Sequence, residues 1–107
     1  MADDTLSGGP PEHDHAEAAG LSFAAFVLSL VHTAAVHFGD VPDPVSGQRA
    51  EINLPAAQQM IDILALMELK TRGNLSAEER QLIDQVLYEL RLRFLESKKE
   101  PSRIILP

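Results

Sequence analysis

A run of sixteen residues in the first half of the chain, Phe23 to Phe38, contains no Asp, Glu, Lys or Arg. Ser22 before the run is a suitable N-cap, and Gly39 after it is a suitable C-terminal stop. The pattern predicts a helix over about residues 22–38 that is apolar around most of its circumference. Because such a helix must be covered by other protein or by lipid, this run constrains the fold more than any other feature.

The polar side chains of this predicted helix do not make a broad solvated face. Ser29, Thr33 and His37 follow at intervals of four residues and form one narrow line. An outer helix of a three-helix monomer needs more polar surface than that. We therefore expect self-association as a homo-oligomer, most simply a dimer, with this helix at the interface. The expected interface residues are Phe23, Phe26, Val27, Leu30, Val31 and Ala34.

Two further helices are predicted in the second half of the chain. One begins near Pro55, with Asn53 or Leu54 at its cap, and runs to about residue 72, before Gly73. A capping box, Ser76 with Glu79, opens another helix over about 77–98. Because only a few residues separate these helices, they should form an antiparallel hairpin. Pro101 is expected to end regular structure, which leaves residues 99–107 as a C-terminal tail.

Apolar spacing identifies the expected core faces of the hairpin. On the helix near 55–72 the face comprises Met60, Ile61, Leu64 and Met67 or Glu68, widened by Ile63, Leu66 and Leu69. On the helix near 77–98 it comprises Leu82, Ile83, Val86, Leu87, Leu90 and Phe94. Glu89 and Arg93 are predicted to pair on the surface at i, i+4. The predicted fold class is all-α, with one helical domain over residues 21–98.

Residues 1–20 differ sharply in composition from the remainder. They carry five acidic residues and no Lys or Arg, which accounts for −5 of the net charge of −7. Since Leu6 is their only large apolar residue after Met1, we predict a disordered acidic tail that helps to keep an apolar helical domain in solution. The acidic balance argues against binding to nucleic acid or to anionic lipid. The chain has no cysteine, which suits a reducing cytoplasm.

Contact with a membrane is the competing explanation for the apolar run. Seventeen helical residues reach about 26 Å, whereas a span must cross roughly 30 Å of hydrocarbon. Two histidines fall inside the run, and no cluster of Lys or Arg flanks it. A protein with a cytoplasmic location and no membrane contact is therefore the favoured prediction, with a membrane-associated accessory protein as the alternative.

Candidate catalytic and metal-ligating residues are few. His13 and His15 form an H-x-H pair in the acidic tail, where nothing preorganises a metal site. His32 and His37 are five residues apart, about 140° around a helix, so one helix cannot aim both at one ion. Across a dimer they could form a pH-sensitive contact, but histidines at the edge of the core are the favoured interpretation. We predict no catalytic residues, no metal and no cofactor.

Several segments together resemble a known family. They are FAAFVLSL from Phe23, the VHFG end of the same run, the KTRGNL junction from Lys70, and LYELRLRF from Leu87. In this order they resemble the small bacterial family called domain of unknown function 1844, over about residues 22–95. The resemblance implies a bacterial, cytoplasmic helical protein and carries no activity, substrate, cofactor or catalytic residue. The expected role is thus a non-catalytic interaction or accessory module, with an unknown protein partner as a further option.

Overall fold

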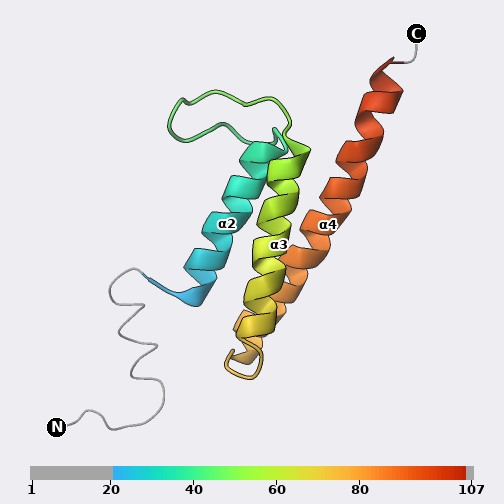
Figure 1. Ribbon diagram of the computed structural model, residues 1–107. Coiled ribbons are helices and arrows are strands. Elements are labelled where there is room, and N and C mark those ends of the chain that lie inside the picture. Colours follow the sequence, from blue (N-terminus) through green and yellow to red (C-terminus); the bar gives the residue numbers. More distant parts are fainter. Residues whose placement is uncertain (1–20, 106–107) are drawn as a thin grey trace, which may run out of the picture.

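The computed structural model describes the backbone of residues 21–105 and the side chains of residues 21–99. Three helices make up this part: α2 (Phe23–His37), α3 (Leu54–Lys70) and α4 (Ala77–Ile105), and no strand occurs between residues 21 and 105. The chain runs up α2, down α3 and up α4 (Figure 1). The predicted all-α class and the antiparallel α3–α4 hairpin are confirmed. The disordered tail predicted for residues 1–20 lies outside the described residues.

Hydrogen bonds at the ends of α2 explain where this helix begins and stops. The Ser22 hydroxyl accepts a bond of 2.9 Å from the Ala25 amide, as an N-cap does. At the other end the Gly39 amide donates to the Val36 carbonyl at 3.0 Å, and the Asp40 amide donates to the Ala35 carbonyl at 2.9 Å. This paired arrangement requires a positive φ at Gly39, which is +79°. The predicted helix ends are confirmed.

The caps of α3 and α4 also follow the sequence prediction. The Asn53 side chain accepts a hydrogen bond of 3.1 Å from the Ala56 amide. Ser76 and Glu79 form a reciprocal capping box. The Ser76 amide donates to the Glu79 carboxylate at 2.9 Å, and the Glu79 amide donates to the Ser76 hydroxyl at 3.1 Å. These caps satisfy amides that the helices themselves cannot pair.

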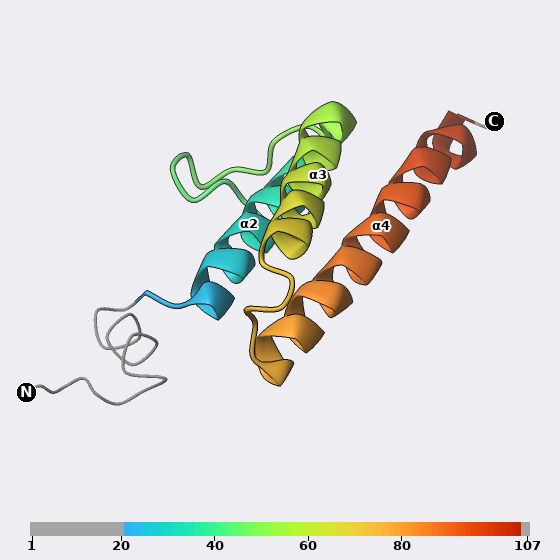
Figure 2. The same ribbon diagram turned by 60° about the horizontal axis from the view of Figure 1, so that its bottom comes forward.

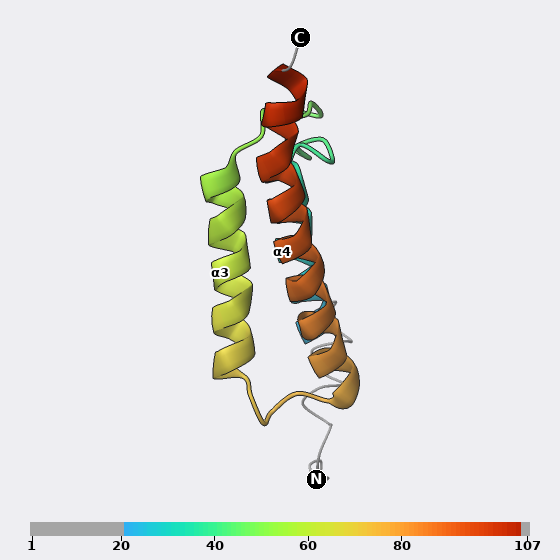
Figure 3. The same ribbon diagram turned by 90° about the vertical axis from the view of Figure 1, so that its right-hand side faces the viewer.

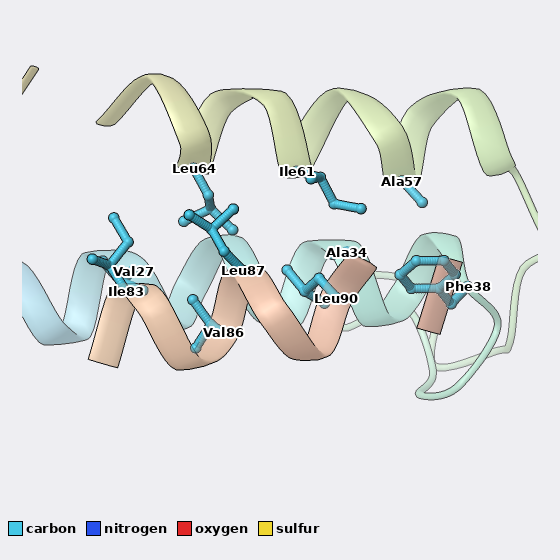
Figure 4. Packing of buried hydrophobic residues seen from close by; sticks show 10 residues of the cluster. All are labelled: Val27, Ala34, Phe38, Ala57, Ile61, Leu64, Ile83, Val86, Leu87 and Leu90. Atoms are coloured by element: carbon cyan, nitrogen blue, oxygen red, sulfur yellow. The ribbon is translucent and has the colours of Figure 1, made fainter. Parts of the chain in front are cut away.

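The core lies along the line where all three helices meet, since each helix contacts the other two (Figure 2). Ala57, Ile61 and Leu64 of α3 point towards the buried side chains of α2 and α4 (Figure 4). The residues of this core cluster are Val27, Ala34, Phe38, Ala57, Ile61, Leu64, Ile83, Val86, Leu87 and Leu90. The core face predicted for α4 is confirmed. On α3, however, Leu66 and Leu69 are about half exposed and point away from the core.

The end of α4 differs from the prediction. The helix continues to Ile105, seven residues beyond the predicted end at 98, and passes through Pro101. A proline inside a helix removes one backbone donor, here the one that would pair with the Ser97 carbonyl, while its fixed φ suits helical geometry. One lost bond does not stop a helix that is already formed for six turns. The last turns of α4 therefore project beyond α3 (Figure 3).

Arg93 joins α4 to the turn after α2. Its guanidinium donates two hydrogen bonds to the Asp40 carboxylate, at 2.8 Å and 2.7 Å. It also lies over the Phe38 ring, 5.2 Å from the ring centre. Helical spacing predicted that Arg93 pairs with Glu89, but the structure places Arg93 beside Asp40. Glu89 instead accepts a hydrogen bond from the side-chain amide of Gln85. A partner 53 residues away cannot be found from helical spacing.

Candidate interaction surface

The six residues predicted to form an interface on α2 occupy three different environments. Val27 and Ala34 are completely buried in the core of the single chain. Phe23, Leu30 and Val31 are partly buried and pack against that core. Phe26 alone among the six is mainly exposed, at 54%. Since Val27 and Ala34 already contact α3 and α4 side chains, they are not accessible to a second molecule in this structure.

The outward face of α2 is nevertheless unusual for an exposed helix. Its exposed residues are Ala25, Phe26, Leu28, Ser29, His32 and Thr33. None of them is an Asp, Glu, Lys or Arg, although surface helices normally carry such residues on their outer side. Phe26 and Leu28 each expose about half of their area. We call these six residues the outer face of α2.

The two hydroxyls on this face are bonded within the helix. The Ser29 hydroxyl donates to the Phe26 carbonyl at 2.7 Å, and the Thr33 hydroxyl donates to the Ser29 carbonyl at 3.1 Å. Each hydroxyl thus gives its one proton to the backbone of its own helix. Because these donors are already used, covering the face costs less desolvation than the number of its polar residues suggests.

Leu28 belongs to the outer face but is absent from the predicted interface. Leu28 is 50% exposed, but consecutive residues of a helix are about 100° apart, so the polar line through Ser29 and Thr33 does not mark its position. The polar residue nearest to Leu28 on the helix surface is His32, four residues later, which is also exposed. The apolar pattern by itself could not show this, since apolar residues occur on nearly every side of α2.

Exposed apolar side chains also occur on the other two helices. α3 exposes Leu66 and Leu69, and α4 exposes Tyr88, Leu92 and Leu95. Single exposed apolar residues are ordinary on protein surfaces and need no explanation. Leu66 and Leu69 share one side of α3, and Tyr88, Leu92 and Leu95 share one side of α4, because they follow at intervals of three and four residues. The outer face of α2 is distinguished by having no Asp, Glu, Lys or Arg.

The charged side chains of the described region lie on α3, α4 and the loops, and several of them form pairs. The Arg72 guanidinium donates to the Glu68 carboxylate at 2.8 Å and 3.0 Å, and this hydrogen bonding lowers the pKa of Glu68. The hydrogen bonds from Arg93 likewise lower the pKa of the Asp40 carboxyl. These pairs are exposed links within the chain, and none of them lies on the outer face of α2.

The histidines do not assemble a metal site in the part of the chain that the structure describes. His32 is exposed on α2 and His37 is half-buried near the end of the same helix. No group of three or more His, Cys, Asp or Glu side chains is placed to hold an ion among residues 21–99. His13 and His15 lie outside the described residues. Within the described range no helix combines the length and the apolar character that crossing a membrane requires.

Comparison with known proteins identifies one relationship. A family model described as "Domain of unknown function (DUF1844)" matches residues 20–96, which include α2, α3 and most of α4. No curated protein and no solved structure matches the chain.

Proposed function

The chain belongs to the family described as domain of unknown function DUF1844, and from that premise we propose that it is a non-catalytic interaction module that self-associates through the outer face of α2. The simplest assembly is a symmetric dimer, in which the same face meets its copy. The proposed module has no catalytic residue, cofactor or nucleic-acid partner, and it works in the cytoplasm. A cysteine-free chain suits that reducing compartment.

One observation carries the proposal: the outer face of α2 is exposed and has no Asp, Glu, Lys or Arg. Interface centres are depleted in charged residues and enriched in aromatic ones, and Phe26 stands on this face. The hydroxyls of Ser29 and Thr33 donate to their own helix, so burying them costs less desolvation than burying free hydroxyls would. A second copy supplies a face with the same properties, so neither chain has to bury an unpaired charge.

The test places a charge on the face and measures the mass of the assembly. Phe26→Glu is expected to give a smaller species by light scattering than the wild-type chain. The matched control is Leu66→Glu, because Leu66 is exposed to the same extent, 54%, but lies on α3. Circular dichroism checks that both variants keep their helices. Equal masses for wild type and Phe26→Glu, with both folded, would refute the proposed interface.

A further inference from the structure

α4 carries a second, independent apolar surface on the side that faces away from the bundle. Tyr88, Leu92 and Leu95 are 65%, 44% and 55% exposed. Their spacing of four and then three residues brings them onto one side of the helix, nearly opposite the buried Ile83 and Leu90. We call these three residues the outer stripe of α4. Apolar residues at alternating intervals of four and three form the contact line between the two helices of a coiled coil.

Two charged side chains flank the outer stripe, one on each side. Arg91 precedes Leu92, and Glu96 follows Leu95, so they take the two flanking positions of the heptad pattern. Both are exposed, and neither has an ion-pair partner within residues 21–99. In a parallel pair of helices, the residue just before one contact residue meets the residue just after the next contact residue on the other helix, five positions later in the sequence. Arg91 of one copy would therefore meet Glu96 of the other.

Most of the remaining charges beside the stripe are engaged inside their own helix, and the exposed Lys99, four residues after Leu95, ends the apolar line of the stripe. Asp84 lies 3.6 Å from Arg80, and the Glu89 carboxylate accepts a bond of 2.6 Å from the Gln85 amide. Lys98 lies over the Phe94 ring, 5.7 Å from its centre. Arg91 and Glu96 are thus the two flanking charges that remain available for ion pairs with a second copy.

We propose that the outer stripe of α4 pairs in parallel with α4 of a second copy, with Arg91 and Glu96 forming reciprocal ion pairs across the contact. α4 has the length for such a contact, because its 29 residues exceed the 17 of α3 and it projects past the bundle (Figures 1 and 3). This contact does not depend on the outer face of α2. With both contacts present, the assembly is larger than a dimer, since each uses a different side of the molecule.

A charge exchange tests the parallel register. Arg91→Glu places a glutamate opposite Glu96 of the other copy, and Glu96→Arg places an arginine opposite Arg91. Because like charges then meet, each single variant should dissociate at a chain concentration several-fold higher than wild type does. The double variant restores opposite charges and should recover the wild-type association. A double variant that associates no better than either single variant would overturn the parallel pairing.

A second experiment separates this contact from the one proposed on α2. The chain has no cysteine, so Leu95→Cys introduces a unique thiol. In a parallel pair the two residues at position 95 face each other, and oxidation should yield a disulfide-linked dimer, also in the Phe26→Glu background. Thr33→Cys, on the outer face of α2, is the matched reporter for the other contact. A disulfide that forms with Thr33→Cys but not with Leu95→Cys would overturn only the α4 pairing. A disulfide that forms with Leu95→Cys but not with Thr33→Cys would overturn only the α2 contact.

Discussion

Arg93 is the side chain that fixes the turn after α2 against α4. The Arg93 side chain is 23% exposed, and the side chain of its partner Asp40 is 41% exposed. Water screens such a pair, so its contribution to stability is modest despite two short hydrogen bonds. The pair nevertheless sets where the loop leaves the bundle, because it connects the first residues of that loop to the middle of α4.

The Asp40 pair predicts a pH dependence of stability. Hydrogen bonding from Arg93 lowers the pKa of Asp40 in the folded chain below its usual value of 3.8. The ionised carboxylate therefore stabilises the fold above pH 3.8, and this contribution is lost as the pH falls through the lower, folded-state pKa. We expect Asp40→Asn to lose about 1 kcal/mol of unfolding free energy at neutral pH and to approach wild type as the pH falls below the folded-state pKa of Asp40, which lies under 3.8.

The measurement is urea unfolding at several pH values and one fixed chain concentration. Glu51→Gln is the control, since Glu51 is an exposed carboxylate in the same loop. A gap between wild type and Asp40→Asn that stays constant from neutral to acidic pH would contradict the assigned role of the ion pair.

Ser97 gives a second prediction for a single residue. It is 1% exposed on α4, and its hydroxyl has no hydrogen-bond partner in the described part of the chain. A buried, unpaired hydroxyl costs free energy, and alanine has the higher helix propensity. Ser97→Ala should raise the unfolding free energy by about 0.5–1 kcal/mol in denaturant titrations. A loss of stability in Ser97→Ala would contradict the cost assigned to the buried hydroxyl.

Individual helices show which features their sequences determine. Caps are local, so Ser22, Asn53 and the Ser76–Glu79 box could be predicted from neighbouring residues. The core side of α4 could be predicted as well, because polar residues alternate with its apolar stripe. The exposed positions of Leu28, Leu66 and Leu69 could not, since an apolar residue next to an apolar stripe is compatible with either side. Only the packing of the other helices determines which side is covered.

The turn at the end of α2 gives a prediction at the scale of an element. Gly39 has φ +79°, and a Cβ there would lie 3.3 Å from Ile52 Cγ1. Gly39→Ala should therefore lose about 1–2 kcal/mol through backbone strain, and more through this contact. Gly47→Ala is the matched control, because Gly47 has φ +74° and no atom within 4 Å of an added Cβ. Thermal unfolding that shows equal losses for both variants would exclude a contribution from the Ile52 contact.

Residues 21–105 form a short bundle of three helices that leaves several large apolar side chains exposed, Phe26 and Leu28 of α2 among them. All three helices were predicted from sequence, whereas the self-association expected from the apolar character of α2 stays a prediction. The sequence could not reveal that the bundle itself covers Val27 and Ala34, and that Phe26 and Leu28 remain outside. It also did not indicate the outer stripe of α4, whose spacing becomes meaningful only once the opposite side of that helix is known to face the core.

Self-association is the central claim, and the molar mass of the wild-type chain in solution tests it most directly. Light scattering across the micromolar range should give a mass greater than that of one chain, decreasing on dilution as the contacts dissociate. A mass equal to that of a single chain throughout this range would contradict the claim.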